Sequence, residues 1–196
     1  MRQRGFSMLE VLVSMLIICL GVLGMVALQT RSLALSQDSI QRTNAMILAS
    51  DLIELMRSNP QVTLADGKFK VDGRYAKQIG NAFRPVALDA GEDCLSRNRA
   101  LGGDTVAGKD LSCWLIQVKA LLPVTDQLIN DAFAVCPAAK SPITRTEAAL
   151  AATAPSTVCE AIPRAAVMVV LAWQSPGADS LNCPQGLCYY ALRSEL

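Results

Sequence analysis

A single carboxylate, that of Glu10, interrupts the apolar N-terminal segment of the chain. Residues 6–28 form a run of 23 residues without any other charged side chain. As an α-helix with a rise of about 1.5 Å per residue, this run can cross a hydrocarbon core of about 30 Å. An ionised carboxylate inside a bilayer costs on the order of 3 kcal/mol, so it normally faces a partner or lies close enough to the interface to stay hydrated. Glu10 is therefore a candidate for pairing with a positive charge.

Six of the seven cysteines follow the apolar run, and their thiols could form disulfides or bind zinc. They are Cys94, Cys113, Cys136, Cys159, Cys183 and Cys188. An even set in an extracytoplasmic domain is typical of a disulfide framework, and an oxidising compartment disfavours the alternative, a zinc half-site at residues 183–188. We predict three disulfides and neither a metal nor another cofactor. Six cysteines allow many connectivities that the sequence alone does not decide; pairing between sequence neighbours, 94 with 113, 136 with 159 and 183 with 188, is the hypothesis we adopt.

The composition argues against catalysis and against nucleic-acid binding. The chain has no histidine, which removes the commonest general base and the histidine-activated serine and cysteine nucleophiles. Its 18 basic and 17 acidic residues give a formal charge of +1, and no basic run marks a nucleic-acid surface. We expect no enzyme, although a membrane-tethered periplasmic enzyme is the alternative from another class.

Two stretches resemble catalytic motifs. Residues 103–109, GDTVAGK, match the first seven positions of a P-loop. However, Asp110 stands where a Ser or Thr hydroxyl would bind Mg²⁺, and its charge would repel phosphate. The adjacent acids Glu92 and Asp93 are expected to be solvated loop charges rather than a catalytic dyad. We therefore expect no nucleotide site and no carboxylate pair of catalytic use.

The helical pattern continues beyond the apolar run as one face of an amphipathic helix. The apolar residues of that face are Ile40, Ile47, Leu48, Leu52, Leu55 and Met56. The sequence Ser58-Asn59-Pro60 ends the pattern, because proline cannot continue the hydrogen-bond ladder. We predict one helix from Phe6 to about Ser58. Gly21 and Gly24 either allow local melting during assembly or only permit close helix packing.

The remaining residues, 60–196, are predicted to form an α+β head. A helix over 110–122 would be capped by Asp110, would place Trp114 in the core and would end before Pro123. Residues 165–173 are apolar on both alternating faces, which indicates a central strand with residues 187–192 as its antiparallel neighbour. The Ala-, Thr- and Pro-rich stretch 137–157 is interpreted as a surface excursion.

The stretch Arg4-Gly5-Phe6-Ser7-Met8-Leu9-Glu10, followed by three apolar residues, resembles the class III signal of type IV pilins and pseudopilins. In that family a prepilin peptidase cleaves after the glycine and N-methylates the new first residue. The resemblance implies cleavage between Gly5 and Phe6, methylated Phe6, and Glu10 as the family's glutamate. An ordinary secretory signal fits less well, because its apolar region of about 7–15 residues ends at a small-residue site.

Cleavage would also give Glu10 its partner. It would create an ammonium group at Phe6, and two chains packed with an axial stagger could place this group against Glu10 of the neighbour. Because a buried charge without its partner is costly, such a pair would fix the register of assembly more than it adds net stability. The basic residues Arg2 and Arg4 precede the run, so the positive-inside rule directs the head to the periplasm.

The head cysteines, the valine-rich late strand and the short C-terminal strand resemble the PilV group of minor pilins. The implied organisation is a cytoplasmic leader (1–5), a transmembrane and filament-core helix (6–28), an amphipathic extension (29–59) and a periplasmic head (60–196).

The group's function implies priming of pilus assembly near the tip, with roles in twitching motility and adhesion. The implied partners are other minor pilins, the major pilin, a tip adhesin-like protein, the prepilin peptidase and the inner-membrane assembly platform. The protein would pass from the inner membrane into the pilus. The alternative is a minor pseudopilin of a type II secretion system, which has the same leader and long helix.

Overall fold

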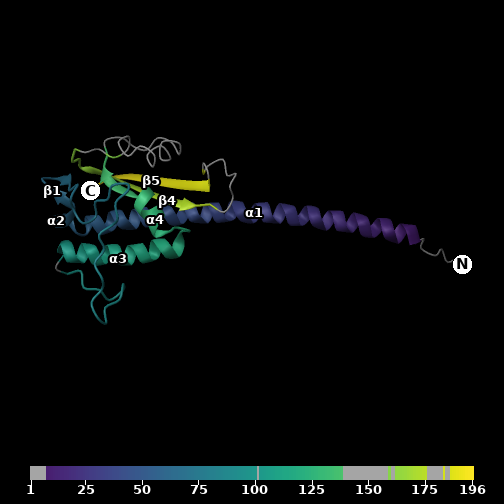
Figure 1. The fold of residues 1–196 in the computed structure, drawn as a ribbon, viewed down its shortest axis with the longest axis horizontal. Coiled ribbons are helices and arrows are strands. Elements are labelled where there is room, and N and C mark those ends of the chain that lie inside the picture. Colours follow the sequence, from purple (N-terminus) through teal and green to yellow (C-terminus); the bar gives the residue numbers. More distant parts are fainter. Residues whose placement is uncertain (1–7, 101, 139–158, 160–161, 176–182, 184–185) are drawn as a thin grey trace. The chain divides into compact units, whose positions relative to one another are not determined.

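The structure is a computed structural model that describes residues 8–100, 102–138, 159, 162–175, 183 and 186–196. The chain divides into two compact units, residues 1–40 and residues 41–196. A long helix, α1 (Met8–Arg57), begins in the first unit and contributes its last turns to the second. The second unit contains the remaining helices and all the strands (Figure 1). The α+β fold class expected from the sequence is therefore confirmed.

In the first unit, α1 is exposed and apolar. No part of its most apolar stretch is buried, and by length and composition the helix can cross a membrane. The helix continues without a break through Gly21 and Gly24, and a Cβ atom at either position would meet no atom within 4 Å. Within the described residues of this chain, neither glycine is needed for a close contact.

The last turns of α1 form part of the core of the second unit. The buried side chains of this part are Ala45, Leu48, Ala49, Leu52, Ile53 and Met56. The stripe expected from the sequence was therefore wrong in part, because Ile40 and Ile47 are 57% and 49% exposed. The sequence argument selected bulky residues, whereas the buried face is built around two alanines that let other elements approach the helix closely. α1 ends at Arg57, next to the predicted breaker.

A second long helix, α3 (Gly103–Leu121), runs antiparallel to the last turns of α1. The amide of Asn59 donates to the carbonyl oxygen of Gly103 at 2.9 Å, and that of Asn44 donates to Leu121 O at 3.1 Å. Trp114 of α3 is buried, as expected, and its Nε1 donates to Leu48 O of α1 at 2.8 Å. These contacts fix α3 along one side of α1.

The predicted start of this helix was wrong. α3 begins at Gly103, not at Asp110, and Asp110 lies in its interior rather than capping it. The head also contains two short helices. α2 (Pro60–Thr63) has proline in its first turn. α4 (Asp126–Ala132) starts after Thr125, whose side chain accepts from Leu128 N. Neither short helix was expected from the sequence.

The main sheet has three antiparallel strands in the order β3-β4-β5. They are β3 (Ala134–Pro137), β4 (Ala166–Gln174) and β5 (Leu187–Glu195). The sequence prediction of a central strand and its antiparallel neighbour is confirmed, because β4 is buried along all but its last residue and pairs with β5 along its whole length. A small hairpin of β1 (Leu64–Ala65) and β2 (Lys68–Phe69) forms a second sheet, and Phe69 N donates to Arg164 O, just before β4, at 2.7 Å.

Three disulfides tie irregular segments to these elements. Their pairs are Cys94–Cys113, Cys136–Cys159 and Cys183–Cys188, the same neighbour pairs that the sequence analysis proposed. The first attaches the loop before α3 to that helix, and the second attaches a later residue to β3. The third closes a short loop at the start of β5. The expected surface excursion over residues 137–157 lies almost wholly outside the described residues.

Candidate functional sites

The first candidate site is the carboxylate of Glu10. It lies near the start of the described part of α1 and is exposed. Within the described residues, its side chain has no hydrogen bond or ion pair, and its neighbours Leu9 and Leu12 are large exposed apolar residues. A carboxylate on an exposed apolar helix needs a positive group from outside its own helix when that helix is in lipid. The predicted cleavage residues Gly5 and Phe6 lie outside the described residues.

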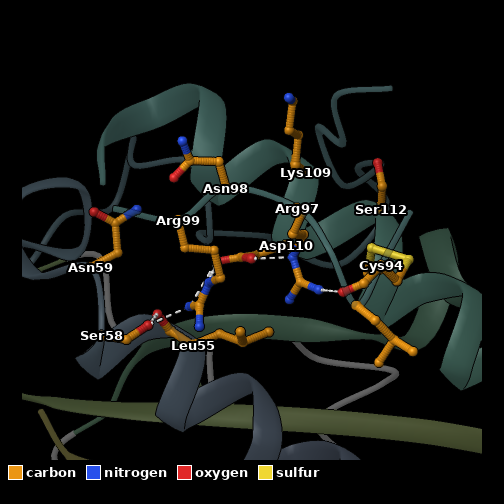
Figure 2. A network of polar contacts seen from close by, with 12 residues as sticks. Leu55, Ser58, Asn59, Cys94, Arg97, Asn98, Arg99, Lys109, Asp110 and Ser112 are labelled. Atoms are coloured by element: carbon orange, nitrogen blue, oxygen red, sulfur yellow. Dashed lines mark hydrogen bonds and ion pairs between the residues drawn. A yellow bond between two sulfur atoms is a disulfide. The ribbon is translucent and has the colours of Figure 1, made fainter. Parts of the chain in front are cut away.

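A second candidate is a buried ionic network in the head, centred on Asp110. Its carboxylate is fully buried, and it accepts from Arg97 Nε at 2.8 Å and from Arg99 Nη2 at 3.0 Å. Figure 2 shows the two guanidinium groups on either side of this carboxylate. The hydroxyl of Tyr75 also donates to Asp110, at 3.3 Å. Burial, reinforced by the negative charge of Asp110, raises the pKa of Tyr75 above its usual value.

The two arginines connect the loop before α3 to other parts of the head. Arg97 also donates to the carbonyl oxygen of Cys94, and Arg99 donates to Ser58 Oγ at 2.6 Å, just past the end of α1 (Figure 2). Charge-assisted hydrogen bonds of this kind are stronger than neutral ones. The network therefore links the end of α1, the loop before α3 and α3 itself, next to the Cys94–Cys113 disulfide.

A cleft of about 410 Å³ opens beside this network between α1 and α3. Its lining residues are Asp51, Glu54, Leu55, Ser58, Arg97, Arg99, Asp110, Cys113, Trp114 and Gln117. Both arginines in the lining are already bound to Asp110, and Glu54 is paired with Arg57 at 2.7 Å. Because these charges are largely satisfied within the chain, we assign the residues that line the cleft to the structural Asp110 network and not to a ligand site.

The P-loop-like stretch does not have the geometry of a phosphate-binding loop. Residues 103–109 form the first turns of α3, so their amides cannot wrap a phosphate as a glycine-rich loop does. The lysine of the motif, Lys109, is bound to Asp89 and Glu92, both at 2.6 Å. The similarity to a nucleotide-binding motif is therefore limited to the sequence.

The expectation for Glu92 was wrong in part, because Glu92 lies in a loop but is not solvated, whereas the expectation for Asp93 fits the structure. The Glu92 side chain is only 13% exposed, because it packs against Lys109 and accepts from the backbone of Asp89 and Asn98. The hydrogen bond from Lys109 is the main reason why the pKa of Glu92 lies below its usual value. Asp93 is exposed and accepts from the backbone N–H of Ser96 at 2.7 Å, which lowers its pKa. Both acids hold the loop in place.

Lys77 is a buried amine that the sequence analysis did not identify. Its Nζ donates to Phe133 O at 2.6 Å and to Asn130 O at 2.9 Å, at the carbonyl end of α4. Burial lowers the pKa of Lys77 to about 8. The sequence gives no direct signal for this burial, since Lys77 lies in an irregular segment with mixed polarity. It stabilises the end of α4 through its contacts with the last carbonyl groups.

The fold and the Glu10 site together define a protein with an apolar helix suited to a membrane and an α+β head. Comparison with known protein families defines the class of this protein more narrowly. Residues 1–26 match the family described as "Prokaryotic N-terminal methylation motif", and residues 27–98 match the family described as "Type IV pilin Tt1218". Together, the two adjoining matches support a place in the type IV pilin superfamily and a structural role as a pilin or pseudopilin. No curated protein and no solved structure gave a match.

Proposed function

We propose that this chain is a minor pilin of a type IV pilus, of the PilV type, that helps to prime pilus assembly and enters the filament at or near its tip. The observation that carries the proposal is the position of Glu10 on an exposed apolar helix, five residues after Gly5. The adjoining family matches support the pilin character of the same segment.

The proposed chemistry starts with processing of the N-terminus. The prepilin peptidase hydrolyses the bond between Gly5 and Phe6. The freed amine of Phe6 then takes a methyl group from a sulfonium methyl donor, which leaves as the thioether while the nitrogen gives up a proton. The ammonium of one subunit pairs with Glu10 of its neighbour inside the apolar layer. A wrong axial stagger would leave both charges unpaired at low dielectric, so the pair selects the correct register.

The proposed location follows from the anchor and its flanking charges. Residues 6–28 hold the chain in the inner membrane with residues 60–196 in the periplasm, and residues 29–59 link the two. Its partners would be other minor pilins, the major pilin, a tip adhesin-like protein and the inner-membrane assembly platform. Extraction of the chain into the filament would then support twitching motility and adhesion.

A deletion strain of the native host tests this function against the alternative. We expect fewer surface pili and reduced twitching, with secretion of exoproteins unchanged, and recovery when the wild-type chain is supplied. Lost exoprotein secretion with normal twitching would contradict the proposal and favour a minor pseudopilin. The wild-type chain should also be present in sheared filaments, detected by mass spectrometry of the head.

A further inference from the structure

The two outer edges of the three-stranded sheet are different. On the β3 side, Lys77 forms a bridge to Val135, with backbone hydrogen bonds of 2.9 and 2.8 Å in the two directions. This short strand also ends in Pro137, which cannot donate to a further strand. On the other side, β5 has nine residues and pairs only with β4 among the described residues. Among the residues that the structure describes, the β5 side is therefore the open edge of the sheet.

The hydrogen bonds at the two ends of the β4–β5 ladder show which backbone groups face this open edge. Ser175 N donates to Gly186 O at 2.8 Å at one end, and Leu196 N donates to Ala165 O at 3.4 Å at the other. In an antiparallel ladder, directly opposed residues alternate between bonded and non-bonded pairs. With the register of these strands, the residues bonded to β4 are Cys188, Tyr190, Leu192 and Ser194. The outward N–H and C=O groups therefore belong to Leu187, Tyr189, Ala191, Arg193 and Glu195. The carbonyl oxygen of Glu195 already accepts from Arg57 Nη2 at 2.8 Å, so the free part of the edge runs from Leu187 to Arg193.

Within the described part of the chain, most of the open edge lacks the features that usually prevent strand addition. Edge strands are commonly protected by charged side chains, prolines, bulges or a covering segment. The first six residues of β5, LCYYAL, contain no charge and no proline, and only Arg193 and Glu195 near its end are charged. Tyr189, Tyr190 and Leu192 are only partly buried and pack against the core. An added strand would meet partly exposed apolar side chains on both faces of the sheet.

The direction of β5 limits which strand can be added. Arg42 of α1 lies over the ring of Trp173, which is opposite Cys188 at the start of β5. Arg57, at the end of α1, donates to Ser194 Oγ at 2.9 Å and to Glu195 O at 2.8 Å. β5 therefore runs alongside the last turns of α1 and in the same direction. Two copies pairing their β5 edges antiparallel would have their Gln41 ends, to which the anchors connect, at opposite ends of the pair. Chains anchored in one membrane disfavour that arrangement.

We propose that the outer edge of β5 binds an extended, uncharged and apolar segment of a different protein, which adds a strand to the sheet through backbone hydrogen bonds. The proposal rests on the proposed function only for the nature of the partner, which would be another subunit of the same assembly. Backbone pairing would provide affinity, and the apolar side chains flanking the edge would select the segment.

Amide hydrogen exchange at single-residue resolution tests the proposal. The full chain is purified alone in detergent, and it is also purified within the complex extracted from cell envelopes of the native host. In the complex, the outward amides of Tyr189, Ala191 and Arg193 should exchange about tenfold more slowly or more, because each would exchange only after the added strand opens. The inward amides of Tyr190 and Leu192, bonded to β4 in both samples, provide the internal control.

Two proline variants separate strand addition from general damage to the head. Ala191→Pro removes an outward N–H group and leaves the bonds to β4 intact, so the chain should fold but should recover less of its partner. Leu192→Pro removes a bond to β4 and should damage the head itself. Should Ala191→Pro also fail to fold, the exchange measurement on the wild-type chain still decides the matter.

Each other outcome counts against the proposal in a recognisable way. Equal exchange of the outward amides in both samples would overturn strand addition while the wild-type chain remains in filaments. Protection that appears in the isolated chain and rises with its concentration would identify a second copy as the occupant, contrary to the proposal. If no subunit co-purifies and the wild-type chain is absent from filaments, both this proposal and the proposed function fail.

Discussion

The Nε atom of Arg97 lies 2.8 Å from Oδ1 of Asp110, and that carboxylate is fully buried in the interior of α3. This pair joins the loop before α3 to the helix that the loop precedes. A buried carboxylate is tolerated only when its charge is paired and its oxygens are hydrogen-bonded, and Arg97, Arg99 and Tyr75 meet this requirement. The stability of the head therefore depends on a polar network as well as on its apolar core.

Replacement of Asp110 should strongly destabilise the head. In Asp110→Ala, two guanidinium groups lose their shared carboxylate, and we expect a loss of about 3–5 kcal/mol in the free energy of unfolding. Urea unfolding followed by the fluorescence of the two buried tryptophans, Trp114 and Trp173, measures this loss. Asp104→Ala is the matched control, because Asp104 lies in the same helix as Asp110 and also pairs with an arginine, Arg74, but is 58% exposed. The loss of unfolding free energy in Asp104→Ala should stay below about 1 kcal/mol. Equal losses in the two variants would contradict a stabilising role of the buried Asp110 network.

Lys77 should make stability depend on pH in the alkaline range. Its pKa is about 8 in the folded chain and 10.5 when unperturbed, so between these values the unfolded state binds more protons. Stability then rises with pH through this window. Relative to Lys77→Met, the wild-type chain should gain up to about 3 kcal/mol between pH 7.5 and pH 10.5, since a tenfold change in a proton-binding constant corresponds to about 1.36 kcal/mol. Urea unfolding of both chains measures the difference, and a constant difference would contradict a buried ammonium group.

Glu92 should contribute to stability above its unperturbed pKa of 4.5 and lose that contribution in acid. A carboxyl group with a lowered pKa in the folded chain binds fewer protons than in the unfolded chain, so stability falls as the pH drops below this value. Glu92→Gln should therefore have a weaker acid dependence of Tm between pH 5.5 and pH 3 than the wild-type chain. Glu54→Gln is the control, because the Glu54 side chain is 68% exposed. A similar change in both variants would argue against the role of the Lys109 contact.

Substitution of Glu10 should affect assembly without affecting insertion. Glu10→Ala removes the carboxylate that would pair with the neighbour's ammonium, so the chain should still enter the membrane but should be depleted from sheared filaments. Glu10→Asp keeps the charge and should retain part of the function. Quantitative immunoblots of membrane and filament fractions measure both effects. Normal piliation in the Glu10→Ala strain would rule out the pairing role.

Substitution of Gly5 should prevent processing of the N-terminus. In Gly5→Val, the bulk of the side chain at the cleavage position should block the peptidase and leave Met1 on the membrane-bound chain. Intact-mass measurement distinguishes this precursor from a chain beginning at methylated Phe6. Ser7→Ala, on the other side of the cleaved bond, should still be processed. Mature chain from the Gly5→Val strain would show that cleavage does not occur where the sequence predicts it.

For α1, a local sequence pattern predicts the helix and its anchor but not which side chains become buried. Its helical character and its apolar anchor could be predicted because both depend on side chains near one another in sequence. Its buried face could not, because Ala45 and Ala49 give almost no hydrophobic signal. Their burial instead results from the close approach of other elements, while Ile47 remains half exposed. By contrast, the sequence predicted the buried strand β4 correctly, because the apolar character of β4 is continuous over both faces and can be read locally.

The sequence by itself determined the anchor, the position of Glu10 within it, the paired late strands and an even set of head cysteines, without deciding how those cysteines pair. These features depend on local composition and on short separations along the chain. Only the tertiary structure decided the burial of Asp110 and Lys77 and the pairing at the β3 edge of the sheet. Each of these depends on residues outside the element concerned: the arginines that neutralise a carboxylate, the carbonyl groups that accept from an amine, and the backbone of Lys77 that pairs with Val135 of β3. A local pattern contains no information about such partners.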